Sequence, residues 1–340
     1  MQTFTGRPTM RDVAALAGVS LATVSRVVNG SPAVDPVLAE RVRAAAAKLG
    51  YRRDETASAL RRADRISTSV GLIIEDISNP FFSAVQRGFE DVARSRGVLV
   101  FSGSSDDDPE RERQLADAFA ARRVDGLVIV PAGADQSYLL RERQAGVPLV
   151  FVDRPPRFID ADAVLSDNAG GARAATEHLL RGGHRRIGYL GDRERIFTAT
   201  ERRRGYGEAL AAERLTPDPG LIRMELADPE AARAAARELL SAAEPPTALV
   251  TGQNLITIGA LNALRDLALQ HEVALVAFDD VPLANLLEPG VTTVAQDPVA
   301  LGRRAAELIF ARLDGDTGAS RTAIVPTELI TRGSGEIAPA

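Results

Sequence analysis

Five short clusters of polar residues carry the side chains most suited to holding a small ligand. They span residues 76–82, 153–154, 192–198, 251–254 and 279–280, and each directly follows a short apolar run. Their carboxylates, amides and guanidinium groups can exchange hydrogen bonds with a polar ligand, and Phe81 and Phe82 add aromatic faces. Because ligands of doubly wound sheets bind beyond the carboxyl ends of the strands, these positions predict a binding cleft.

The sequence patterns of an enzyme are missing. The chain contains no dinucleotide-binding or phosphate-binding glycine motif and no serine nucleophile elbow. Cysteine is absent, which excludes disulfides, thiolate nucleophiles and cysteine-bound metals, and the three histidines offer little material for another metal site. We therefore expect a protein that is not an enzyme, with no catalytic residue, no cofactor and no metal.

The elements that must position these clusters alternate along the chain from residue 66 onward. Strands are predicted at 70–74, 98–101, 126–130, 149–152, 187–190, 248–251, 274–278 and 291–295. Amphipathic helices are predicted at 80–96, 110–122, 169–181, 202–213, 229–242 and 256–268. This alternation predicts parallel sheets covered by helices on both faces, and about 275 residues suffice for two Rossmann-like lobes.

The charge is distributed unevenly between the two ends of the chain. The net charge is −5 over 340 residues, but residues 1–65 carry eleven basic and six acidic residues, or +5. The remainder carries 30 basic and 40 acidic residues, or −10. A small basic module joined to a larger acidic body suggests that the basic end contacts nucleic acid.

The basic end has the pattern of a helix-turn-helix. Thr9 to Asp12 reads as a capping box, and we expect Val13, Ala14, Leu16 and Ala17 on the buried side of the helix that follows. Gly18 can end this helix, and Ser20 can cap a second helix from Leu21 to Asn29. A third helix, at 36–49, completes a small core. A three-helix scaffold without a DNA role remains the alternative for this pattern alone.

The order and spacing of DVAALAGVSLATVSRVVNG, the later KLGY and the stretch that closes on Ala59 and Leu60 resemble the LacI/GalR family of bacterial repressors. SNPFF at 78–82, RVDGL at 123–127, ERRRGY at 201–206 and FDD at 278–280 extend the resemblance through the body. It implies a DNA-binding domain at 1–51, a hinge helix and linker at 52–65, and a core of the periplasmic-binding-protein type at 66–340. Within the core, one lobe would comprise about 66–165 and 297–323, and the other about 166–296 and 324–340.

The resemblance also assigns residues to operator contact. Leu21, Ala22 and Arg26 would read bases, with Arg26 as the bidentate partner of a guanine. Thr9, Ser20, Thr23, Ser25 and Asn29 would contact phosphates, which position the domain without specifying sequence. Leu60 would enter the minor groove from the hinge helix. Asp54 and Glu55 depart from the family pattern there and would repel phosphate unless they cap that helix.

The ligand contacts implied by the resemblance fall in the predicted cleft: Phe81, Phe82, Asp153, Arg154, Arg202, Gln253, Asn254 and Asp279. Together they suggest a carbohydrate site. Family members commonly carry Asn-Asp where this chain has Gln253 and Asn254, so the ligand here could be an unusual sugar, an acidic or phosphorylated one, or no sugar at all. Arg154, Arg193 and Arg195 keep a phosphorylated ligand open.

The resemblance implies a cytoplasmic repressor of carbohydrate-utilisation genes whose operator affinity changes when a small ligand closes the two lobes. Its partners would be a near-palindromic double-stranded operator and a second copy of the chain, with no membrane. A purine-responsive member of the same family is one alternative. A solute-binding receptor without a DNA role is another, although that class has no use for residues 9–30.

Overall fold

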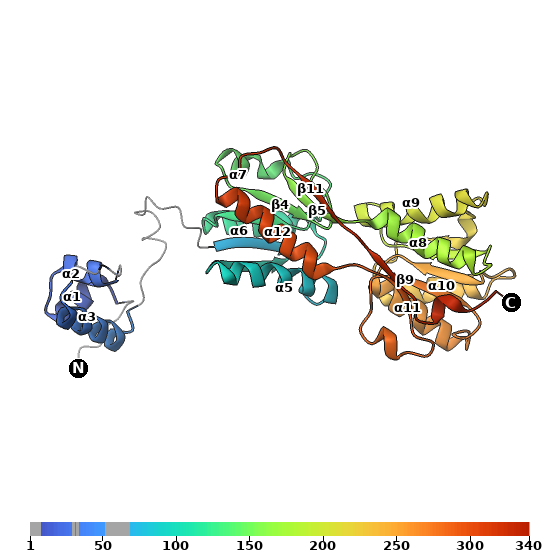
Figure 1. The fold of residues 1–340 in the computed structure, drawn as a ribbon, viewed down its shortest axis with the longest axis horizontal. Coiled ribbons are helices and arrows are strands. Elements are labelled where there is room, and N and C mark those ends of the chain that lie inside the picture. Colours follow the sequence, from blue (N-terminus) through green and yellow to red (C-terminus); the bar gives the residue numbers. More distant parts are fainter. Residues whose placement is uncertain (1–7, 29–30, 32–33, 52–68, 340) are drawn as a thin grey trace. The chain divides into compact units, whose positions relative to one another are not determined.

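The computed structural model describes residues 8–28, 31, 34–51 and 69–339. The chain divides into two compact units, Met1–Ile66 and Ser67–Ala340, which we call the head and the core (Figure 1). Asn29, Leu60 and the whole expected hinge, 52–65, lie outside the described residues, so the predictions made for them stay predictions.

Three helices make up the head: α1 (Met10–Ala17), α2 (Leu21–Val28) and α3 (Pro36–Leu49). The predicted capping box is confirmed, since Asp12 N–H donates to Thr9 Oγ1 at 3.4 Å and Thr9 N–H donates to the Asp12 carboxylate at 2.7 Å. Gly18 ends α1 with a φ of 63°, a conformation that glycine adopts without strain. The core of the head consists of Val13, Ala14, Ala17, Val24, Val42 and Ala45.

One expectation for the head is wrong. Leu16 was placed on the buried side of α1, but its side chain is 46% exposed. The head is so small that three buried residues of α1 already fill the contact with α2 and α3. A fourth apolar residue on the same short helix therefore faces outward.

The first lobe of the core is built on a six-stranded parallel sheet in the order β11-β5-β4-β3-β1-β2. Its strands are β1 (Ser69–Ile74), β2 (Leu99–Ser104), β3 (Gly126–Ile129), β4 (Leu149–Val152), β5 (Asp162–Ser166) and β11 (Thr322–Val325). Its helices are α5 (Pro80–Ser95), α6 (Pro109–Ala121), α7 (Leu140–Gln144) and α12 (Pro298–Leu313). Helices α5 and α12 pack together on one face of the sheet, and α6 covers the other (Figure 1).

The second lobe repeats this plan with the order β12-β10-β9-β8-β6-β7, in which β12 is antiparallel to β10 and the other pairs are parallel. Its strands are β6 (Ile187–Leu190), β7 (Ile222–Arg223), β8 (Ala248–Thr251), β9 (Ala274–Phe278), β10 (Thr292–Ala295) and β12 (Glu328–Ile330). Its helices are α8 (Asn168–Arg181), α9 (Phe197–Ala212), α10 (Pro229–Leu240) and α11 (Asn254–Asp266). Short 3-10 turns lie at Ser137–Leu139, Pro219–Leu221, Ala284–Leu286 and Ser334–Glu336.

The chain passes between the lobes three times, after β5, after β10 and after β11. The last passage falls slightly later than expected. Strand β11 pairs with β5 as far as Val325, so 324 and 325 belong to the first lobe and not to the second. Two parallel α/β lobes and a helical head confirm the predicted fold class.

Glycine allows the outer helices of the first lobe to pack closely. A Cβ on Gly302 of α12 would overlap the backbone carbonyl of Val85 in α5, and one on Gly88 of α5 would overlap the carbonyl of Val299. The two helices therefore touch backbone to backbone, which fixes α12 against the sheet even though it follows the second lobe in sequence.

Candidate functional site

The candidate ligand site is a cavity of about 280 Å³ between the two lobes of the core. All eight residues proposed as ligand contacts line it: Phe81, Phe82, Asp153, Arg154, Arg202, Gln253, Asn254 and Asp279. They come from both lobes, and all but Arg202, which lies within α9, follow the carboxyl ends of strands or begin the next helix. The structure thus brings the predicted residues together, while their contact with a ligand remains a prediction.

Asp153 and Asp279 occupy equivalent places in the two lobes. Asp153 directly follows β4 and Asp279 directly follows β9, the third strand from the end of each sheet. Both residues are buried, and both have a left-handed backbone conformation, with φ of 69° and 70°. Each donates its amide N–H to the next strand, Asp153 to the carbonyl of Val164 at 2.9 Å and Asp279 to that of Val294 at 3.0 Å. Neither caps a described helix; Asp153 Oδ1 has no partner among the described residues, whereas Asp279 Oδ1 accepts from Gln296 Nε2.

Arg202 holds the second-lobe side of the cavity. Only 5% of the residue is exposed, so it is not a surface arginine. Its Nε donates to Asn168 Oδ1 and its Nη1 to the carbonyl of Gly252, both at 2.7 Å. Nη1 also lies 3.6 Å from a carboxylate oxygen of Asp279, and the guanidinium stacks 3.9 Å from the ring centre of Phe278.

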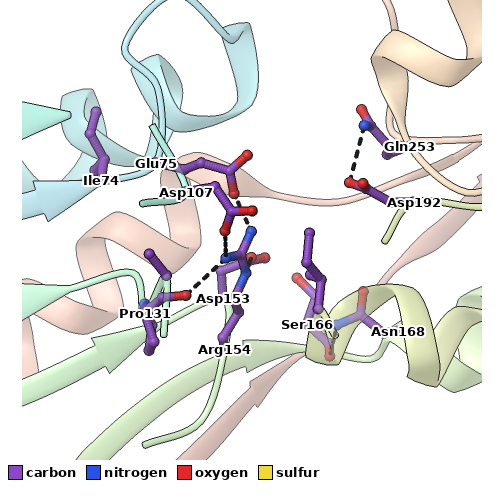
Figure 2. Close-up of polar contacts among 12 residues, drawn as sticks. Ile74, Glu75, Asp107, Pro131, Asp153, Arg154, Ser166, Asn168, Asp192 and Gln253 are labelled. Carbon is purple, nitrogen blue, oxygen red and sulfur yellow. Dashed lines mark hydrogen bonds and ion pairs between the residues drawn. The ribbon is translucent and has the colours of Figure 1, made fainter. Parts of the chain in front are cut away.

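Arg154 is the centre of an ion-pair cluster in the first lobe (Figure 2). Its Nη1 donates to Asp107 and to the carbonyl of Pro131, both at 2.8 Å, and its Nη2 bonds the carboxylate of Glu75. Asp153 is a more distant neighbour, 3.7 Å from Nε. This guanidinium is therefore already matched by carboxylates of the protein, and they hold its pKa above the ordinary value.

The remaining predicted contacts have mixed roles. Phe82 belongs to the core cluster of the first lobe, whereas Phe81 is half-buried and meets it edge-to-face with ring centres 5.1 Å apart. Gln253 caps α11 through Leu255 N–H and donates to Asp192 at 3.3 Å. Asn254 donates to Asn79 of the first lobe at 2.8 Å, so part of its hydrogen-bonding capacity joins the lobes.

Six residues that line the cavity fall outside the clusters and ligand contacts predicted from the sequence: Glu75, Asp106, Asp107, Ala227, Leu255 and Gln296. Glu75 directly follows β1 and Gln296 directly follows β10, so the rule used for the other clusters could have found both. Asp107 was missed because β2 extends to Ser104, three residues beyond the predicted strand end.

Burial raises the pKa of three carboxyl groups of this cavity, those of Glu75, Asp153 and Asp192. It raises the pKa of Glu75 from an ordinary 4.5 to about 7, against the opposing effect of Arg154. Burial likewise raises the pKa of Asp153, opposed by Arg154 and Arg202, and that of Asp192. A ligand that donates hydrogen bonds would replace the lost solvation of these groups.

The candidate DNA-contact residues lie on the head, and the structure describes all of them except Asn29 and Leu60. Leu21, Ala22 and Arg26 project from α2 and are exposed, whereas Thr23 and Ser25 are half-buried. Thr9 and Ser20 are exposed, but their hydroxyls already serve the helix starts, Thr9 by donating to Asp12 at 2.6 Å and Ser20 by bonding Thr23 at 2.9 Å. Arg26 is thus the exposed base-reading candidate with the strongest donors.

None of the described helices is long and apolar enough to cross a membrane. Nor do three or more metal-binding side chains gather at one place among the described residues.

Comparison with known proteins matches both units. Residues 9–54 match the model of the bacterial regulatory proteins of the lacI family, and residues 176–335 match the periplasmic binding protein-like domain. The transcriptional regulator CelR of Thermobifida fusca is 34% identical over 97% of this chain and 98% of its own. A solved CelR–cellobiose complex has a TM-score of 0.71 at 31% identity, covering 96% of this chain and 100% of that one. The lac repressor dimer bound to operator has a TM-score of 0.84 at 24% identity over 97% and 99% of the two chains, which shows a common fold.

Proposed function

Because this chain belongs to the lacI family of bacterial regulatory proteins, which are DNA-binding transcriptional regulators and not enzymes, we propose that it represses carbohydrate-utilisation genes in response to an uncharged sugar. The sugar would bind between the lobes and change the affinity of a dimer for a near-palindromic operator in the cytoplasm. The CelR–cellobiose complex supports the ligand class, because that relative shares nearly the full length of this chain.

The observation that carries this proposal is that several buried polar atoms around the cavity lack a hydrogen-bond partner among the described residues. Asp153 Oδ1, Arg154 Nε and Gln296 Oε1 are buried and have no hydrogen-bond partner among the described residues. Unpaired buried polar atoms are rare in native proteins and call for an explanation. A hydroxyl group both donates and accepts, so a sugar can satisfy carboxylate, amide and guanidinium atoms at once.

The charges indicate that the sugar is uncharged. Of the arginines that kept a phosphorylated ligand open, Arg154 and Arg193 bond Asp107 at 2.8 and 2.7 Å, and Arg195 bonds it as well. Arg202 is held by protein oxygens in the same way. The described part of the cavity therefore presents carboxylates with spare acceptor capacity, while each of these guanidinium groups already bonds protein oxygens and, among their buried nitrogens, only Nε of Arg154 lacks a partner.

The ligand half of the proposal is tested by Asp279→Asn, which removes a carboxylate but keeps the side-chain shape. A thermal-shift screen of the wild type against neutral sugars, sugar phosphates and purines first identifies a ligand, since binding to the native state raises the melting temperature. We expect Asp279→Asn to bind the operator normally and to lose the response to that ligand. Asp280→Asn is the matched control, because Asp280 is bonded to Arg332 and does not line the cavity. A full ligand response in the Asp279 variant would contradict the assignment.

The DNA half is tested by Arg26→Ala. A bidentate arginine–guanine contact is worth about 1–3 kcal/mol of discrimination, so preference for the operator over random DNA should fall by about tenfold or more. Arg43→Ala is the control, since it removes the same charge from exposed α3. Both variants should keep salt-sensitive binding to random DNA. Equal loss of operator preference in the two variants would refute the base-reading role of Arg26.

A further inference from the structure

Asp107 is surrounded by three guanidinium groups, although it was not among the predicted site residues. Its side chain is 3% exposed, and it lies in the loop between β2 and α6. Arg154 Nη1 donates to its Oδ1 at 2.8 Å, and Arg193 Nη1 donates to its Oδ2 at 2.7 Å. Arg195 Nη2 bonds the same Oδ2. One buried carboxylate thus occupies the meeting point of three cations.

The three arginines come from both lobes. Arg154 follows β4 of the first lobe, whereas Arg193 and Arg195 follow β6 of the second. Convergent guanidinium groups at a cleft are the arrangement with which proteins bind carboxylate and phosphate ligands, because the planar fork donates two parallel hydrogen bonds. Here the anion that completes the arrangement belongs to the protein itself.

We propose that Asp107 is the specificity-determining residue of the cleft: its carboxylate takes the place of a ligand's anionic group, so that phosphorylated and acidic sugars are rejected. Such a ligand would have to displace Asp107 from its three partners or bind beside its charge. Glu75 and Asp153 line the same cavity and add to that repulsion when their carboxyl groups are ionised. The inference rests on the proposed function in taking this cleft as the effector site.

The proposal predicts that loss of one charge converts the cleft into an anion site. Asp107→Asn suits the test because asparagine tolerates the left-handed backbone of this position, where φ is 57°. Its neighbour Asp106 supplies a matched control. Asp106 is also left-handed, with a φ of 53°, lies at the edge of the cavity and pairs with Arg111. Asp106→Asn therefore removes an equal charge from the same loop without releasing the three cleft arginines.

Inorganic phosphate is the probe, and the full-length wild type and both variants are titrated with it by calorimetry and by thermal shift. We expect Asp107→Asn to bind phosphate at least about tenfold more tightly than the other two, because its guanidinium groups have lost their partner. Equal phosphate affinity in all three proteins would overturn the proposal. So would an equal gain in Asp106→Asn, because the effect would then be one of net charge alone.

Removal of the carboxylate that Arg154, Arg193 and Arg195 share could prevent Asp107→Asn from folding. Phosphate added during refolding should then rescue it, and if it does not, Asp107→Asn combined with Arg195→Gln provides the decisive protein, with one cation fewer. That double variant must still bind phosphate more tightly than wild type, or the proposal fails. Phosphate binding is measured here without DNA or sugar. The proposed function would fail in a different experiment, if no sugar altered operator binding, so the two failures are distinguishable.

Discussion

The buried carboxyl group of Glu75 should make the core less stable as the pH rises through neutrality. Unfolded Glu75 loses its proton near pH 4.5, whereas burial raises its pKa in the folded core to about 7. Between these values the folded state binds more protons than the unfolded state, so the free energy of unfolding falls as pH increases. At about 1.4 kcal/mol for each pKa unit, the full loss is roughly 3 kcal/mol, complete above pH 7.

The variant that isolates this effect is Glu75→Gln, which cannot titrate. Its free energy of unfolding should exceed that of the wild type by a growing margin from pH 5 to pH 8. The margin corresponds to a shift of roughly 6 °C in melting temperature for a core of this size. The chain contains no tryptophan, so unfolding is best followed by far-ultraviolet circular dichroism.

The test depends on how the stability difference between Glu75→Gln and the wild type changes with pH. Its absolute size is not informative, because the substitution also removes a hydrogen bond to Arg154. Asp135→Asn is the control. Hydrogen bonds from Ser137 lower the pKa of exposed Asp135, so its carboxylate is ionised in both states across this range and its margin should be constant. Parallel stability curves for the wild type and Glu75→Gln between pH 5 and pH 8 would refute the reasoning.

Three further substitutions probe packing and charge. Gly302→Ala should destabilise the core by about 1–3 kcal/mol, because the added methyl group overlaps a carbonyl of α5. The control, Gly207→Ala, lies in an open part of α9 and should be neutral or stabilising. The melting temperatures of the two variants test both expectations. Arg312→Met leaves buried Asp162 without its two side-chain hydrogen bonds, at 2.7 and 2.9 Å. The free energy of unfolding, measured by chemical denaturation, should fall by about 3–5 kcal/mol. A fall of less than about 1 kcal/mol would contradict this expectation. Arg202→Met should abolish ligand binding in calorimetry while operator binding persists, and an unchanged ligand affinity would exclude Arg202 from the site.

The helices with local start signals were predictable from the sequence. Asp35 accepts from the first amide groups of α3, and proline opens both α3 and α5, so predicted and observed starts agree. Helix α9 has no side-chain cap and begins at Phe197, five residues before the predicted start. Periodicity alone cannot find such a boundary, because helix starts without a capping residue leave no local mark.

The strands that were missed depend on partners far away in the sequence. Strand β5 begins with Asp162, an unfavourable residue for a buried strand. Its carboxylate is held by Arg312 on α12, 150 residues later, and by the amide of Arg321. Strands β11 and β12 each pair with an edge of a different sheet, although only two residues separate them. These pairings are long-range contacts that local patterns do not encode.

The residues of the candidate site were likewise predictable only where a local pattern marks them. Position after a strand identified most of the polar residues on the cavity wall, since the parallel sheet delivers them to one edge. It could not show which charges neutralise one another. In the sequence, three arginines leave a phosphorylated ligand open: Arg154, Arg193 and Arg195. In the structure, all three bond the carboxylate of Asp107.

The duplicated plan of the core explains how a ligand could act on the head. Asp153 and Asp279 are equivalent residues on different lobes, so a ligand that bonds both carboxylates would hold the lobes together. The head, however, precedes β1 and is therefore linked by the chain to the first lobe alone. In the proposed function, a ligand contact with Asp279 would act through the contacts between the two lobes, because the chain joins the head to the first lobe. Three chain crossings permit rotation of one lobe against the other but resist their separation, so a rotation is the motion that such a ligand would bias.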